Sequence, residues 1–411
     1  MSQYSHALWK LKQDLSGPLI GQLDAFAIHI ESLGFPRQYL GRQLRVVANF
    51  SRWLKDNNVT IKNIRTRHVS LFLNTHHPEK CGTTGEHATL KRLINFLQEH
   101  GLCQQPVQQT KQSQVQKAVD DFGCYLVVER NLSPKTRIQY APTITRFLSE
   151  RFGRKKINLS RLSAADIISF IQKEASRRSI ARAKVATNAM RAFIRYGIQC
   201  CDIAPNLSSA VPSVAAWTMT DIPRAISLSD VQAVLSHCPR DTLIGLRDYA
   251  ILLLLARLGL RSGEIVGLTL DSIDWEAGSI FVAGKLAKST WLPLPADVGD
   301  AISSYLLHGR PQIPDRTLFL RTMAPIGPLG AQQTIATIVN AAIKRAGVSP
   351  PTRGSHQFRH ALATNLLSKG ASIDDIGRIL RHRHAKTTNI YTKVHVDALR
   401  ALSLPWPGGV R

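Results

Sequence analysis

The stretch "SHQFRHALATNLLSKG" (355–370) combines an apolar stripe with a basic face. His356 and Arg359 are three residues apart, so on a helix they lie on one face. The leucines that follow continue as an apolar stripe, and Gly370 is suited to end the helix. The stretch therefore predicts a helix that packs against a core while it presents basic side chains.

Further blocks on either side extend this pattern. Upstream, "RLGLRSGEIVGL" (257–268) places Arg261 at a break between an apolar helix and a second helix. "SIFVAG" (279–284) and "STWLPLP" (289–295) predict two short strands of a hairpin, with Lys285 at its turn. Downstream, "RHRH" (381–384) precedes Tyr391. We therefore expect a mainly helical α+β domain with a small antiparallel sheet.

The first half of the chain contains two similar all-helical segments. In each, four blocks with apolar residues three and four apart predict amphipathic helices, in the same order in both. A Gln-rich stretch separates the segments, and a Pro-containing stretch follows the second. We predict four regions: a first helical module, a second helical module, a linker and a mixed α+β domain, at residues 1–105, 114–202, 203–227 and 228–411.

The charge balance is strongly basic, with 53 Lys and Arg against 28 Asp and Glu, a net charge of +25. The excess is +7 over residues 1–112, +10 over 113–220 and +8 over 221–411. Because every segment carries the excess, an extended contact with a polyanion such as DNA is expected. No apolar run is long enough to span a bilayer, and the six cysteines do not suggest a disulfide framework. These features predict a cytoplasmic protein without a membrane partner.

The clustered basic residues and Tyr391 suit phosphodiester cleavage without a metal or cofactor. Tyr391 is suited to attack phosphorus and form a phosphotyrosine. Arg261 and Arg359 can clamp the phosphate oxygens. Lys285 can protonate the departing 5′ oxygen, with His356 and His382 as hydrogen-bond donors or proton carriers.

The blocks around Arg261, Lys285, His356–Gly370 and His382–Tyr391 resemble, in order and spacing, the catalytic domain of the tyrosine recombinases, the phage-integrase family. Residues 114–200 resemble the helical core-binding domain of that family, a SAM-like module that residues 1–105 repeat. The resemblance implies a site-specific recombinase or integrase that moves a mobile element. It also implies action on double-stranded DNA as a homotetramer on paired sites, with or without accessory or partner recombinases. The family's catalytic positions fall on Arg261, Lys285, His356, Arg359, His382 and Tyr391.

The chain departs from the family's usual pattern at two places, Arg381 before the late histidine and Leu286 where the hairpin usually has a second glycine. Arg381 stands where the family usually has glycine before the late histidine, and its guanidinium would contact DNA or crowd the site. His384 is a second candidate for that histidine, and Lys288 is an alternative to Lys285. Glu264 is expected to orient Arg261 rather than to move a proton.

Several alternative functions and sites remain open from the sequence. They are a catalytically inactive DNA-binding partner of other recombinases, a chromosome-dimer resolvase and a type IB topoisomerase. A metal-dependent transposase would need clustered carboxylates. The spacing of His76, His77, Cys81 and His87 matches no familiar zinc knuckle. Five arginines of the first module make a DNA contact the favoured prediction there: Arg37, Arg42, Arg45, Arg65 and Arg67.

Overall fold

The computed structural model describes ten stretches of the chain: residues 16–76, 84–103, 113–153, 155–200, 203–214, 225–284, 289–330, 332–382, 384–388 and 390–391. The chain separates into two compact units, one of Pro106–Thr220 and one of Met1–Gln105 with Asp221–Arg411. No helix in the described stretches is long and apolar enough to cross a membrane.

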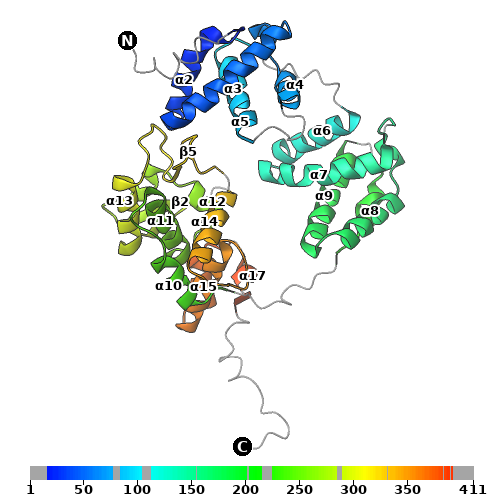
Figure 1. Ribbon diagram of the computed structural model, residues 1–411. Coiled ribbons are helices and arrows are strands. Elements are labelled where there is room, and N and C mark those ends of the chain that lie inside the picture. Colours follow the sequence, from blue (N-terminus) through cyan, green and yellow to red (C-terminus); the bar gives the residue numbers. More distant parts are fainter. Residues whose placement is uncertain are drawn as a thin grey trace, which may run out of the picture. The chain divides into compact units, whose positions relative to one another are not determined.

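The first module contains the four predicted helices (Figure 1). They are α2 (Leu23–Ser32), α3 (Arg37–Asp56), α4 (Thr66–His76) and α5 (Thr84–Glu99), with 3-10 turns at Ile20–Gln22 and Ile61–Asn63. In α3, buried residues recur three or four positions apart, as at Leu40, Leu44 and Val47, so one face packs inward. The rings of Phe26, Phe50 and Phe96 belong to the same core.

The second unit also contains four helices. They are α6 (Gln114–Val128), α7 (Pro134–Phe152), α8 (Ala164–Arg177) and α9 (Ile180–Gln199), followed by a 3-10 helix at Pro205–Ala210. Local sequence sets where they begin: the Ser133 hydroxyl accepts a hydrogen bond from the N–H of Lys135, with Pro134 at the first helical position. Ser163 and Asp166 cap α8 reciprocally.

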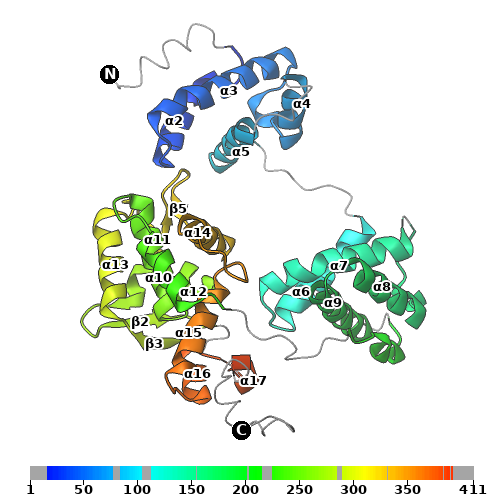
Figure 2. The ribbon, with the colours of Figure 1, turned by 60° about the horizontal axis from the view of Figure 1, so that its bottom comes forward.

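The region from residue 225 onward has a mixed architecture. Its helices are α10 (Leu228–Ser236), α11 (Leu243–Arg257), α12 (Ser262–Val266), α13 (Ala296–His308), α14 (Gln332–Arg345), α15 (His356–Ser368), α16 (Ile373–Ile379) and α17 (Ala385–Thr388). Figures 1 and 2 show α11 between α13 on one side and α14 and α15 on the other. Helix α11 is apolar nearly all round, as its "AILLLLA" run predicts, because it is packed on several sides.

The predicted hairpin is confirmed, and one strand is added to it. Strand β2 (Ser279–Val282) pairs antiparallel with β3 (Thr290–Pro293), and Ile280 lies opposite Leu292. A short strand that we did not predict, β1 (Ile273–Asp274), pairs with the other edge of β2. With two residues it is too short to show an alternating pattern. A second small pair consists of β4 (Leu320–Arg321) and β5 (Gly327–Pro328). The predicted fold class, helical modules followed by a mainly helical α+β domain with a small antiparallel sheet, is confirmed.

Candidate active site

Arg261 lies in the break between α11 and α12. Gly259 bends the chain there with φ +56°, and a β-carbon on it would come within 3.0 Å of the side chains of Leu362 and Leu380. The Glu264 carboxylate accepts hydrogen bonds from the backbone N–H of Arg261 at 2.9 Å and from its guanidinium at 2.6 Å. The close helix contact therefore needs glycine, and the short helix α12 presents Arg261 with its guanidinium already oriented.

Arg359, on α15, is almost completely buried, with 3% of its surface exposed. It donates one hydrogen bond to the carbonyl of Gly259 at 2.5 Å and another to the carbonyl of Leu380. Burial, followed by the positive charges of Arg261 and Arg381, lowers its pKa to about 10. Arg359 therefore remains charged at neutral pH and ties together two segments that are distant in sequence.

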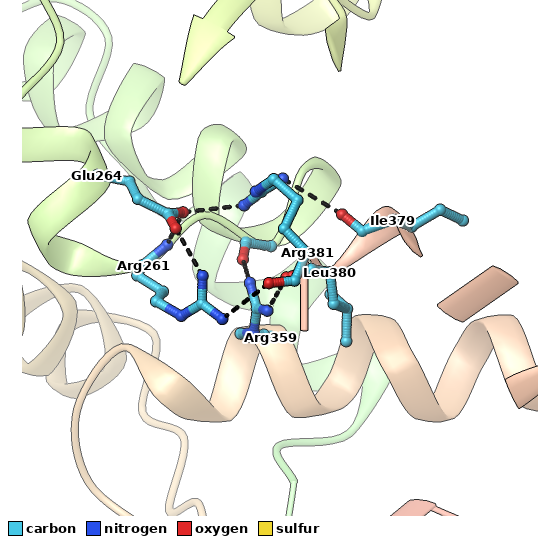
Figure 3. Close-up of polar contacts among 7 residues, drawn as sticks. Arg261, Glu264, Arg359, Ile379, Leu380 and Arg381 are labelled. Carbon is cyan, nitrogen blue, oxygen red and sulfur yellow. Dashed lines mark hydrogen bonds and ion pairs between the residues drawn. The ribbon is translucent and has the colours of Figure 1, made fainter. Parts of the chain in front are cut away.

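Arg381 joins this group through Glu264. Figure 3 shows the Glu264 carboxylate between two guanidinium groups, those of Arg261 and Arg381. Arg381 donates to Glu264 Oε2 at 2.9 Å and to the carbonyl of Ile379 at 3.2 Å. Its own carbonyl accepts from the Arg261 guanidinium at 3.4 Å. We call these four residues, Arg261, Glu264, Arg359 and Arg381, the guanidinium cluster.

The backbone of Arg381 has φ +55°, a left-handed conformation that costs a non-glycine residue about 1–2 kcal/mol. The family's usual glycine is suited to this conformation. Arg381 adopts it nonetheless, because hydrogen bonds hold its guanidinium to Glu264 and Ile379 and its carbonyl to Arg261. Burial tends to raise the pKa of Glu264. The Arg261 N–H and the charges of Arg381 and Arg261 outweigh burial, so this pKa lies below its usual value. An ionised Glu264 can orient the arginines, as predicted, but does not carry a proton at neutral pH.

Tyr391 lies in a pocket of its own and is 1% exposed. Its hydroxyl is 2.9 Å from Nδ1 of His360, and its ring stacks on His382 with centroids 6.3 Å apart and an interplanar angle of 8°. Nδ1 of His382 is 2.8 Å from the hydroxyl of buried Thr388. We call these four residues, His360, His382, Thr388 and Tyr391, the tyrosine pocket. Apolar side chains of α15 and α16 complete its walls.

Electrostatics keeps the histidines of the site neutral. Burial, and then the charges of Arg359 and Arg261, lower the pKa of His382 to about 4. Desolvation lowers the pKa of His356 as well, with further contributions from Arg359 and Arg261. Burial raises the pKa of Tyr391, although the same two arginines act in the opposite direction. The tyrosine is therefore protonated at neutral pH and needs a base.

The structure brings five of the predicted residues into one region: Arg261, His356, Arg359, His382 and Tyr391. Lys285 and its alternative Lys288 lie outside the described residues. His384 is exposed, whereas the ring of His382 stacks on that of Tyr391; the assignment of His382 as the late histidine stays a prediction. Within the described stretches, no group of three or more His, Cys, Asp or Glu side chains is placed to hold a metal ion. His77 and Cys81 lie outside those stretches.

Sequence reasoning missed His360 and Thr388. His360 follows Arg359 directly and lies one helical turn after His356, so the spacing in "HQFRH" already placed both histidines on neighbouring positions of one face. Thr388 carried no such signal, because its contact with His382 depends on the turn into α17.

The comparisons with known sequences identify the family. The profile of the phage integrase family matches residues 224–397. A Sinorhizobium fredii protein named as an integrase/recombinase, y4rA, is 42% identical over 411 residues, covering 99% of this chain and 99% of that protein. The tyrosine recombinase XerD of Mycobacterium tuberculosis is 30% identical over 310 residues, covering 69% of this chain and 94% of XerD.

Solved structures show the same fold. The XerH site-specific recombinase, in a post-cleavage complex with its palindromic difH substrate, covers 72% of this chain and 98% of its own, with a TM-score of 0.58 at 17% identity. A lambda integrase dimer bound to a COC′ core site covers 67% of this chain and 94% of its own, with a TM-score of 0.52 at 16% identity. The class is thus a tyrosine-type, site-specific DNA recombinase. Within that class, the chain belongs to the phage integrase family.

Proposed function

We propose that this chain cuts and rejoins duplex DNA through a 3′-phosphotyrosine at Tyr391 and thereby moves or integrates a mobile element. The observation that carries the proposal is the placement of Tyr391 in the same compact unit as two fixed arginines, Arg261 and Arg359, whose charges act on it. Guanidinium groups held in place before DNA arrives stabilise the charge that develops on a phosphate in the transition state.

Each remaining residue has a role in this scheme. Tyr391 attacks phosphorus and displaces the 5′ oxygen. His382 is neutral; with Nδ1 accepting from Thr388, its Nε2–H is free to donate to a phosphate oxygen. His356 stands at the exposed start of α15, where it can donate likewise. Lys285 is the proposed general acid for the leaving oxygen.

The partners follow from the charge and the relatives. An excess of positive charge in every segment suits an extended DNA contact, and XerH and lambda integrase were both solved on DNA. We propose a homotetramer on paired sites. We place movement of a mobile element first because y4rA, which matches over nearly the whole chain, is named as an integrase/recombinase.

A chromosome-dimer resolvase is the second candidate, favoured by the 30% identity to XerD. XerD leaves about three-tenths of this chain unmatched, which is why we place it second. Recombination assays in cells separate the two functions. One plasmid carries two copies of the element's ends, and a second plasmid carries two copies of the chromosome's replication-terminus region. Joining of the element's ends supports mobile-element movement, and exchange confined to the terminus sites supports resolution.

The test of the chemistry is Tyr391→Phe on a nicked duplex that traps the cleaved state. We expect no detergent-resistant protein–DNA adduct and nearly unchanged DNA binding, because one hydroxyl is lost and the ring remains. Tyr249→Phe is the matched control, since Tyr249 is a partly buried tyrosine of the same region that packs under Arg240. An adduct formed by Tyr391→Phe would overturn the nucleophile assignment, and no adduct from the unaltered chain would favour the inactive DNA-binding partner.

The general acid has a separate test. If Lys285 protonates the leaving oxygen, Lys285→Ala will cleave slowly on ordinary DNA and close to normally when that oxygen is replaced by sulfur, which needs no acid. Single-turnover cleavage of both substrates measures the ratio. If the sulfur-substituted DNA restores cleavage by Lys288→Ala but not by Lys285→Ala, the general acid is Lys288.

A further inference from the structure

The mechanism above leaves one step without a residue, the removal of the proton from Tyr391. Tyr391 is 1% exposed as a whole residue, so bulk water does not reach its hydroxyl freely. Burial also raises its pKa. A group inside the pocket must therefore take the proton as the tyrosine attacks.

His360 is the group in hydrogen-bond contact with that hydroxyl. Its Nδ1 lies 2.9 Å from the Tyr391 oxygen, and the two rings have centroids 5.6 Å apart at 59°, so the hydroxyl meets the nitrogen at the edge of the imidazole. This distance is within the range required of a general base. His356 stands one turn earlier at the exposed start of α15, with its ring centroid 6.5 Å from that of His360. His356 is therefore better placed for the phosphate than for the tyrosine.

The surroundings of His360 keep its imidazole neutral. Four titratable or charged groups lie near His360. His356 and Arg359 belong to its own helix, and Tyr391 and His382 belong to the segment beyond α16. Burial, then His356 and Arg359, lower the pKa of His360 below the ordinary value of 6.5. At neutral pH a lone pair is therefore free on one nitrogen. The negative charge of a bound phosphodiester offsets the nearby cations and favours protonation once DNA is in place.

We propose that His360 is a catalytic residue, the general base that accepts the Tyr391 proton on Nδ1. The proposal rests on the proposed function, in which Tyr391 is the nucleophile. In the cleavage step the Tyr391 O–H bond breaks and its proton moves to Nδ1, which forms an imidazolium with Nε2–H already present. The phenolic oxygen bonds to phosphorus, the bond from phosphorus to the 5′ oxygen breaks, and that oxygen takes a proton from a separate acid.

Religation runs the same steps in reverse. The 5′ hydroxyl gives its proton back to the separate acid and attacks the phosphotyrosine. The tyrosine oxygen leaves phosphorus and recovers its proton from Nδ1 of His360. No oxidant, metal or nucleotide enters this balance, and the same histidine serves both directions.

The test combines His360→Asn with a fluorinated tyrosine at position 391. Asparagine keeps a polar group near the position of Nδ1 but is not a base at neutral pH. We expect single-turnover adduct formation to fall by about 10²–10⁴-fold, the usual contribution of a general base. Incorporation of fluorotyrosine at position 391 lowers the phenol pKa, so the deficit of His360→Asn should shrink by at least tenfold. Equal deficits with tyrosine and fluorotyrosine would overturn the proposal.

His356→Asn is the comparison variant. It should also slow cleavage, but fluorotyrosine should not restore it, because His356 is placed to act on the phosphate. The full-length chain with fluorotyrosine at position 391 and no other change provides a second test. It does not depend on whether a variant at His360 folds. We expect cleavage by the unaltered chain to slow as His360 is protonated on the acidic side of neutrality, and this pH dependence should weaken with fluorotyrosine. A persistent pH dependence of the same size would count against His360.

The failure of this inference is distinguishable from failure of the proposed function. If Tyr391→Phe still forms the adduct, the nucleophile is wrong and the function falls. If Tyr391→Phe forms none while His360→Asn cleaves at the normal rate, the function stands and only the general-base assignment is wrong. Unchanged binding of core-site DNA by His360→Asn shows that a loss of rate is not a loss of fold.

Discussion

The guanidinium cluster and the tyrosine pocket, the two halves of the site, are held in different ways. In the cluster, each cation is fixed by directional bonds: Arg359 to two backbone carbonyls, and Arg261 and Arg381 to one carboxylate. In the pocket, Tyr391 is held by apolar packing, by stacking on His382 and by a hydrogen bond between its hydroxyl and His360. Directional bonds set orientation as well as distance, whereas apolar burial does not. The guanidinium cluster, which we propose binds the phosphate, is therefore preorganised more strictly than Tyr391, the proposed nucleophile.

The halves also differ in access. The side chain of Arg261 is 39% exposed, but Tyr391 is 1% exposed. An approaching phosphate can therefore reach Arg261 while Tyr391, the proposed nucleophile, is still covered. Binding of charge and activation of the nucleophile should therefore respond separately to mutation.

The largest effect is expected from Arg359→Ala. It removes a transition-state donor, which costs about 10²–10³-fold in rate, and strands two buried carbonyls at roughly 1–3 kcal/mol each. Single-turnover cleavage and denaturant unfolding measure the two losses. Arg257→Ala is the control: its ion pair with Asp297 is about half exposed, so its effect should stay below about 1 kcal/mol. Normal cleavage by Arg359→Ala would show that the cluster is structural only.

A smaller effect is expected at Arg381. The variants Arg381→Gly and Arg381→Ala separate the effect of the left-handed backbone from the effect of the lost side chain. Both variants lose the bond to Glu264, so both should cleave about tenfold more slowly, as expected when a charged hydrogen bond of about 1.5 kcal/mol is lost. Only glycine relieves the left-handed backbone, so Arg381→Gly should be about 1 kcal/mol more stable than Arg381→Ala. Cleavage by Arg381→Gly at or above the normal rate would show that Arg381 crowds the site instead of orienting Arg261.

The smallest effect concerns the pH dependence of stability in the tyrosine pocket. The pKa of His382 is about 4 in the folded chain and ordinarily 6.5. As pH falls from 6.5 towards 4, the unfolded chain takes up a proton that the folded chain does not, so the free energy of unfolding falls. His382→Asn should flatten part of this decline in denaturant titrations, and the part that remains reflects His356 and His360, whose pKa values are shifted in the same direction. If the free energy of unfolding falls with pH equally in the unaltered chain and in His382→Asn, the pocket is open to water in the DNA-free chain.

Local pattern predicted most of the fold. The eight helices of the two N-terminal segments and the β2–β3 hairpin follow from apolar spacing, caps and alternation, all of which act within a few residues. The third strand was missed because two residues carry no period. At the site, the structure brings Arg261, His356, Arg359, His382 and Tyr391 into one region, as the spacing of their blocks led us to expect, and their catalytic roles, like that of Lys285, remain predictions.

The sequence by itself determined which chemical groups the site contains, because basic side chains and one tyrosine in ordered blocks suit phosphodiester cleavage. The tertiary structure alone decided their partners. Arg381 meets Glu264 across 117 positions, Arg359 meets Gly259 across 100, and His360 meets Tyr391 across 31. Such contacts arise from the packing of α11, α12, α15 and the segment after α16, and no local periodicity encodes them. For that reason the left-handed backbone of Arg381 and the contact between His360 and Tyr391 became visible only in the folded chain.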